Sequence, residues 1–230
     1  MAKVHITKIA AAGRQLRAAI RMYFGGEDEL AIQTVAAASY RLLADLKAER
    51  GKDEAADVYL TGTFYVVRDF RRGTLPKNLM NDPAFMVWAK WLAEQLPIGP
   101  ETKIEDVSVH MSPEAARSFW RERNKVANFL KHADRDVEAS IALDEVDNLL
   151  LLMQSFSAYA DLARDGLGNE GLVFELFINA DSTPSNPATQ REDLLQKLAA
   201  APESDRRKMC SMLVRELNKM DEPKGTTRGT

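Results

Sequence analysis

The sequence predicts an all-α fold, built as an antiparallel helical bundle with a C-terminal helical appendix. Apolar residues recur at spacings of three and four through most of the 230 residues, which is the period of amphipathic helices. Strong helix starts, in which a capping residue precedes a proline, occur at Asp82-Pro83 and Ser112-Pro113. With 45% hydrophobic residues, the chain is long enough to form one or two globular domains.

A helical hairpin is predicted at the start of the sequence. Residues 6–24 carry apolar residues at helical spacing, and Gly25-Gly26 ends this helix. The basic residues interspersed among them are Lys8, Arg14, Arg17 and Arg21. A second helix is expected from Glu27 or Asp28 to about Glu49. Its core face is expected to hold Leu30, Val35, Ala38, Leu42 and Leu46. Two long helices joined by a short glycine turn are typical of an antiparallel pair.

The middle of the sequence is predicted as mostly helical. Residues 53–80 contain two β-forming runs, but the residues around these runs favour helix. Asp82-Pro83 then begins a helix that carries Phe85, Trp88 and Trp91. At spacings of three, these aromatic residues are interpreted as core residues rather than as platforms on which bases stack.

The second half of the sequence is predicted to contain further helices and a linker. After a loop at residues 98–110, helices are expected at residues 113–133, 144–164, 171–179, 189–200 and 202–220. Prolines and serines between residues 180 and 188 predict a linker. The resulting division is a helical bundle domain (1–180), a linker (181–188), a helical hairpin appendix (189–220) and a disordered tail (221–230).

Composition excludes several classes of protein. No apolar run is long enough to cross a bilayer and the start lacks signal-peptide character, so we expect a cytoplasmic protein without a membrane partner. The single cysteine, Cys210, excludes an intramolecular disulfide and is interpreted as a buried or half-buried thiol. The net charge of −3 gives no overall attraction to nucleic acid. The glycines match no phosphate-binding loop.

Metal and other cofactors are not predicted. Four residues offer ligating atoms in one region of the sequence: His110, His132, Asp134 and Asp136. Their spacing matches neither a His-Glu-x-x-His pair nor the repeated Glu-x-x-His of a di-iron bundle. The two aspartates are interpreted as the end of a helix.

Residues 113–136 carry the polar pattern that is most informative about function. At about 100° per residue, one face of this helix collects Arg117, Arg121, Asn124, Lys125, Asn128, His132 and Arg135. Phe119, Val126 and Leu130 fall on the opposite, core-facing side, and Arg123 falls on that side too. With Lys131, the segment contains six basic and three acidic residues from position 117 onward. The pattern predicts a local anion-binding surface on an acidic protein.

This polar face holds the groups that phosphodiester cleavage requires. An imidazole can accept or donate a proton near neutral pH, and arginine or lysine can stabilise the charge on a phosphorane, so no metal is needed. The run from Arg121 to Asp134, RERNKVANFLKHAD, resembles the signature helix of HEPN-domain proteins. These are all-α bundles common in toxin, antiphage-defence and RNA-processing systems. The resemblance implies a bacterial homodimer acting on RNA, in which two copies of the motif form an endoribonuclease site that leaves a 2′,3′-cyclic phosphate.

Carried over residue by residue, the resemblance implies that His132 transfers the proton, with Asn128 as its polar companion. Arg121 or Arg123 then corresponds to the motif arginine. The residues expected to contact RNA are Arg117, Asn124, Lys125, Lys131 and Arg135.

Two other interpretations stay open at this point. In the first, Asn124, Asn128 and His132 form a polar seam that is hydrogen-bonded to a neighbouring helix. The dipole at the C-terminal end of the helix would by itself favour a histidine there. In the second, the chain is a non-catalytic interaction protein that offers a helical face, such as residues 189–220, to a protein partner or to a second copy of itself.

Overall fold

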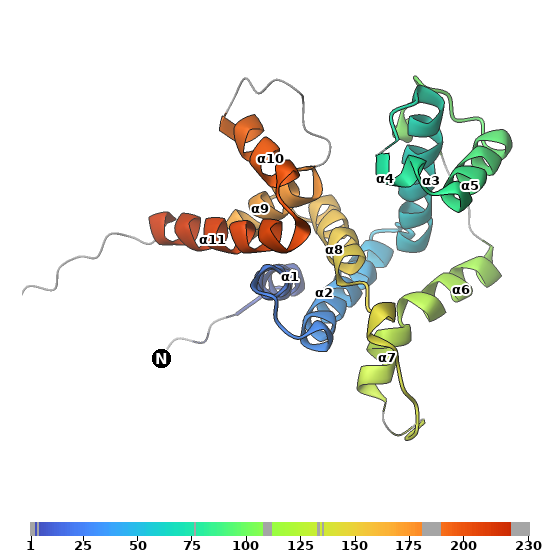
Figure 1. The fold of residues 1–230 in the computed structure, drawn as a ribbon. Coiled ribbons are helices and arrows are strands. Elements are labelled where there is room, and N and C mark those ends of the chain that lie inside the picture. Colours follow the sequence, from blue (N-terminus) through green and yellow to red (C-terminus); the bar gives the residue numbers. More distant parts are fainter. Residues whose placement is uncertain are drawn as a thin grey trace, which may run out of the picture. The chain divides into compact units, whose positions relative to one another are not determined.

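The computed structural model describes residues 3, 5–75, 77–107, 112–132, 134, 136–180 and 190–221. Within these residues every regular element is a helix, which confirms the predicted all-α class (Figure 1). The α-helices are α1 (Lys8–Gly25), α2 (Glu29–Glu49), α3 (Glu54–Arg72), α4 (Lys77–Met80), α5 (Pro83–Gln95), α6 (Pro113–Arg123), α7 (Lys125–Lys131), α8 (Asn148–Leu162), α9 (Gly168–Ile178), α10 (Gln190–Ala200) and α11 (Glu203–Asp221). Short 3₁₀ turns are η1 (Ile104–Asp106) and η2 (Leu143–Glu145).

Contacts within the chain divide it into two compact units. The first unit comprises Met1–Leu46 and Val126–Thr230, and the second comprises Lys47–Lys125. The last residues of α2 therefore belong to the second unit, and all but the first residue of α7 belong to the first. The boundaries predicted after residues 180 and 188 both fall within the first unit.

The two helices predicted for the start of the chain are present as α1 and α2. α1 begins after Thr7, whose hydroxyl accepts a hydrogen bond from a first-turn amide at 3.2 Å. It ends at Gly26, which has a left-handed φ of 68° that a residue without a side chain adopts easily. Asp28 caps α2, because its Oδ1 accepts from two first-turn amides, each at 3.0 Å.

Three helices of the first unit share a buried cluster. Ala12 of α1, Leu43 of α2, and Ala158 and Leu162 of α8 pack together. Ser39 of α2 donates its hydroxyl proton to the carbonyl oxygen of Ala12 at 2.9 Å, so the buried hydroxyl is paired. Full burial of one leucine side chain, such as that of Leu43, contributes about 2 kcal/mol to folding.

The face that α2 buries differs from the predicted one. Its most buried apolar residues are Ile32, Ala36, Tyr40, Leu43 and Ala44. The five residues predicted for the core face, from Leu30 to Leu46, are all half-buried. Apolar residues occupy most sides of this helix, so the 3.6-residue period alone does not identify a single core face.

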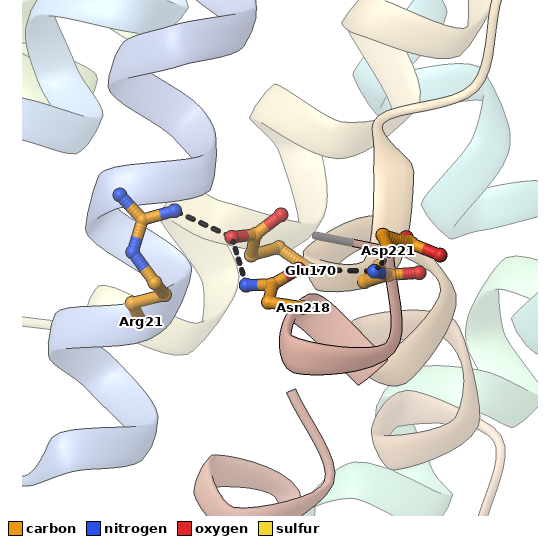
Figure 2. A network of polar contacts seen from close by, with 5 residues as sticks. Arg21, Glu170, Asn218 and Asp221 are labelled. Atoms are coloured by element: carbon orange, nitrogen blue, oxygen red, sulfur yellow. Dashed lines mark hydrogen bonds and ion pairs between the residues drawn. The ribbon is translucent and has the colours of Figure 1, made fainter. Parts of the chain in front are cut away.

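The C-terminal helix α11 is held against α1 and α9. Arg21 donates from Nη1 to Glu170 Oε1 at 2.5 Å, and Nδ2 of Asn218 lies 3.3 Å from the same oxygen (Figure 2). Asn169 donates to Oδ1 of Asn218 at 2.9 Å and to Oδ2 of Asp221 at 2.7 Å. The Glu170 side chain is only 6% exposed, so these donors replace its water contacts.

Residues predicted as a C-terminal appendix form the helical pair α10 and α11. α11 contacts α1 and α9, and α10 contacts α9, so both helices are part of the first unit. The predicted linker 181–188 lies outside the described residues, as do residues 222–230 of the predicted tail. Asp221, predicted as the first residue of that tail, is instead the last residue of α11.

The second unit packs α3 against α5 and α6. Asp53 caps α3 by accepting from the amides of the second and third helical residues at 3.1 and 3.3 Å. Phe64 and Val67, which lie in or beside a β-forming run, are buried with Leu92 and Ile98 in one cluster. Helix is therefore favoured here because packing outweighs a local β-propensity.

A group of three charges, two of them buried, lies at the start of the second unit. Lys47 Nζ lies 2.6 Å from Oε2 of Glu54 and 2.7 Å from Oδ2 of Asp57. The side chains of Lys47 and Glu54 are only 2% and 4% exposed, whereas that of Asp57 is 44% exposed. A buried lysine is tolerated because two carboxylates compensate its charge.

Candidate functional site

The segment predicted to carry the site begins as expected. Ser112 Oγ accepts a hydrogen bond from the amide of Ala115 at 3.2 Å, and Pro113 occupies the first helical position of α6. Glu114 lies in the first turn, where its own backbone N–H and then the Ser112 hydroxyl lower the pKa of its carboxyl group. Local sequence signals thus fix the start of α6.

The prediction of one continuous helix over residues 113–133 is wrong at Asn124. α6 ends at Arg123, and Asn124 has φ −93° and ψ 2°, outside the helical region. The amide of Asn124 still bonds to the Trp120 carbonyl oxygen at 3.0 Å, and α7 begins at Lys125. Asparagine favours such helix ends because its short polar side chain competes for backbone hydrogen bonds.

This break coincides with the boundary between the two units. The predicted residues Arg117, Arg121, Arg123, Asn124 and Lys125 belong to the second unit. Asn128, Lys131 and His132 belong to the first unit, and Arg135 lies outside the described residues. The residues predicted for one polar face are therefore divided between the two units.

Two arginines of α6 present their guanidinium groups to solvent. Arg117 pairs with Glu114 at 3.0 Å between Nη2 and Oε1. Arg121 contacts Glu122 at 3.4 Å and donates to the hydroxyl of Ser118 at 3.3 Å. Exposed pairs of this kind contribute about 0 to 1 kcal/mol, so a phosphate can replace the acceptor at little cost. Arg123 and Asn124 are half-buried.

His132 lies just beyond the end of α7. The buried residues Val126 and Ala127 anchor this helix, while Asn128 and Lys131 are exposed. The amide of His132 donates to the carbonyl oxygen of Asn128 at 3.0 Å, which continues the helical pattern by one residue.

The imidazole of His132 is accessible and has an acidic neighbour. Its side chain is 35% exposed, and Nδ1 lies 3.9 Å from Oδ1 of Asp134. That distance is too long for a hydrogen bond, so the nitrogen is not held by this carboxylate. With the exposed Asn128 and Lys131 beside it, His132 can accept or donate a proton to a bound anion. The exposure of Asn128 also argues against a buried polar seam.

The prediction that Trp88 and Trp91 are core residues is wrong. Their side chains are 44% and 54% exposed, and the buried residues of α5 are Ala89, Leu92 and Ala93. The rings of Phe85 and Trp88 are in contact, with centroids 5.6 Å apart and planes tilted by 56°. Val87 is also exposed, so α5 presents an apolar and aromatic face on the second unit. The sequence could not indicate this, because nearly every position of α5 from Phe85 to Leu92 is apolar.

Cys210 is a buried thiol, as predicted. It is fully buried in α11, and burial raises its pKa to about 12. A buried thiol of this kind is inert, because the thiolate is the reactive form.

The pKa shift predicts that Cys210 resists labelling in the folded protein. At pH 8 the group stays protonated, since its pKa of about 12 lies well above that pH. We expect an aromatic disulfide reagent to modify the native thiol at least about 100-fold more slowly than the urea-unfolded thiol. The pKa of the thiol is higher in the folded than in the unfolded protein. Burial of the neutral thiol therefore keeps its full contribution to the free energy of unfolding below the unfolded pKa of about 8.5, and this contribution falls as the pH rises above that value. Equal labelling rates in both states would contradict this assignment.

In the described part of the chain, no three His, Cys, Asp or Glu side chains gather in a way that could hold a metal ion, and His110 lies outside that part. Among the described helices, none is long and apolar enough to span a bilayer.

No known protein family, no curated protein and no solved structure matches this chain.

Proposed function

We propose that this chain is a HEPN-like RNA-binding protein that cleaves RNA without a metal, with His132 as the proton-transfer group. The observation that carries the proposal is the position of His132 at the accessible end of α7, with Asn128 and Lys131 exposed beside it. A histidine in a purely structural seam would instead be enclosed by its hydrogen-bond partners. The resemblance of residues 121–134 to the HEPN signature supplies the class of substrate.

The proposed reaction is an internal transfer at phosphorus. The neutral imidazole of His132 removes the proton of a ribose 2′-hydroxyl, whose oxygen attacks the adjacent phosphorus. The bond from phosphorus to the 2′-oxygen forms, the bond from phosphorus to the 5′-oxygen breaks, and an imidazolium gives its proton to the leaving oxygen. The products are a 2′,3′-cyclic phosphate and a 5′-hydroxyl. Lys131 can stabilise the charge on the phosphorane.

Two copies of the chain supply a base and an acid in this proposal. Each copy carries one histidine in the motif, so a homodimer places a neutral and a protonated imidazole at one phosphate. Within the second unit, the exposed Arg117 and Arg121 of α6 offer cations to an RNA backbone independently of His132. The half-buried Arg123 is the less suitable motif arginine, because its guanidinium is less accessible to a polymer.

A second candidate function is favoured by the aromatic face of α5. Val87, Trp88 and Trp91 are all exposed, and tryptophan is enriched where proteins bind one another. In this alternative the chain is a non-catalytic interaction protein whose partner covers α5. The residues 189–220 first considered for this role include α11, which packs on α1 and α9.

The proposed function is tested by cleavage of single-stranded RNA in the presence of EDTA. Purified full-length protein is incubated with end-labelled RNA of mixed sequence, and DNA of the same sequence serves as the control. We expect RNA fragments and intact DNA, because DNA lacks the attacking 2′-hydroxyl. Intact RNA at micromolar protein concentration would overturn the proposal and leave the interaction function.

A further inference from the structure

A cavity opens in the first unit beside the N-terminal half of α1. Its volume is about 390 Å³, and it is bounded by α1, by Tyr159 of α8 and by the turn before α9. Binding pockets for small molecules have volumes of about 300 to 1,000 Å³. The cavity is therefore large enough for a small organic molecule.

Two arginines line this cavity without an acidic partner. Arg14 and Arg17 lie one turn apart on α1, and no carboxylate lines the cavity. In the described part of the chain, neither arginine makes an ion pair or a side-chain hydrogen bond. Arg21, one turn further along, is by contrast neutralised by Glu170 at 2.5 Å. The lining of the cavity thus contains two cationic side chains and no carboxylate.

Gly13 shapes the cavity, and Gly168 lies beside Arg17. A Cβ atom at Gly13 would lie 2.8 Å from Cε2 of Tyr159, so the absence of a side chain allows the tyrosine ring to lie against α1. Gly168 has a φ of 74°, and a Cβ there would lie 3.6 Å from Nη1 of Arg17. A Cβ at that distance would make ordinary van der Waals contact, so the positive φ, and not the guanidinium, is what favours glycine here.

Apart from His5 and the Gly166 backbone, the remaining wall of the cavity is mostly apolar. Ile6, Ala10 and Leu167 contribute aliphatic surface, and Tyr159 contributes its ring. A ligand that fits both parts needs an anionic group for the arginines and an apolar body for this wall. Guanidinium groups bind phosphate and carboxylate through paired hydrogen bonds.

We propose that this cavity binds a small organic anion, whose phosphate or carboxylate group contacts Arg14 and Arg17 while an aromatic or aliphatic body lies against Ile6, Leu167 and Tyr159. The site consists entirely of first-unit residues and does not depend on RNA cleavage at His132. Both arginines are needed, because one exposed ion pair contributes little by itself.

The test is isothermal titration of the full-length protein with four probes. Phenyl phosphate and benzoate share a ring and differ in the anionic group, phenol retains a ring without the charge, and inorganic phosphate retains the charge without a ring. We expect dissociation constants at or below about 1 mM for phenyl phosphate or benzoate, and binding at least about 10-fold weaker for phenol and inorganic phosphate. The better of the two anions identifies the head group.

The variant R14Q/R17Q is expected to bind the preferred anion at least about 10-fold more weakly. Glutamine keeps the helix propensity of arginine, and circular dichroism checks that the fold is retained. The matched control is Arg41→Gln, an exposed arginine of α2 that pairs with Asp45 at 3.1 Å. This control should bind like the wild type. Three results would overturn the proposal. Phenol binds as tightly as the anions, or no probe shows binding at concentrations up to about 10 mM, or R14Q/R17Q binds the preferred anion as tightly as the control does.

Discussion

Replacing His132 with glutamine is expected to lower the rate of RNA cleavage by about 100-fold or more. Glutamine keeps a polar side chain of similar size, but it cannot accept or donate a proton near neutral pH. Because His132 is partly exposed, its replacement should change the free energy of unfolding by less than about 0.5 kcal/mol. The measurement is the single-turnover cleavage rate in EDTA, together with a thermal unfolding curve.

A matched control separates proton transfer from a general loss of charge. Lys219 of α11 is exposed and pairs with Glu216 at 2.8 Å, so Lys219→Gln removes a charge from a surface ion pair far along the sequence from His132. This variant should cleave RNA at the wild-type rate. If His132→Gln cleaves as fast as Lys219→Gln, His132 is not the proton-transfer group.

Replacing Lys47 with methionine is expected to lower the free energy of unfolding by about 3 to 5 kcal/mol. Methionine fills a similar volume, but it leaves Glu54 buried at 4% exposure without its cation, beside the Asp57 carboxylate. An uncompensated buried charge is far more costly than a lost surface pair. Urea unfolding monitored by circular dichroism measures the change.

Two controls show that burial rather than the ion pair alone determines this loss. Lys197 pairs with Asp193 at 2.7 Å, nearly the same distance as in the buried pair, but both side chains are exposed. Lys197→Met should therefore cost about 1 kcal/mol or less. The double variant K47M/E54L removes both buried charges and should recover most of the stability. Similar losses for Lys47→Met and Lys197→Met would refute the role assigned to the buried pair.

Much of the fold could be predicted because its signals are local. The helix starts at Asp82-Pro83 and Ser112-Pro113 combine a capping side chain with a proline, and both occur in the structure. The end of α1 at Gly26 follows from the left-handed conformation that glycine adopts. Each of these features depends on residues within one helical turn of one another.

Features that depend on distant residues were not predictable in the same way. Lys47 is a charged residue near the end of α2, and its burial depends on Glu54 and Asp57 from the next helix. α11 joins the first unit through Glu170 and Asn218, which no short motif connects. Long-range packing of this kind leaves no periodic signal in the sequence.

The residues of the candidate site stay a prediction from the sequence, whereas their surroundings come from the structure. His132, Asn128 and Lys131 were identified from the motif, and the structure places them together at the end of α7. The break at Asn124 was missed, because neither glycine nor proline marks it. The cavity beside α1 was missed as well, since Arg17 and Tyr159 meet only after the helices have packed.

The most direct test of the proposed function is the chemical nature of the RNA ends that the wild-type protein produces in EDTA. Mass spectrometry of the fragments distinguishes a 2′,3′-cyclic phosphate from a 3′-hydroxyl. Attack by the 2′-hydroxyl, with His132 transferring the proton, predicts a 2′,3′-cyclic phosphate on one fragment and a 5′-hydroxyl on the other. Fragments that end in a 3′-hydroxyl and a 5′-phosphate, or RNA that stays intact, would contradict it.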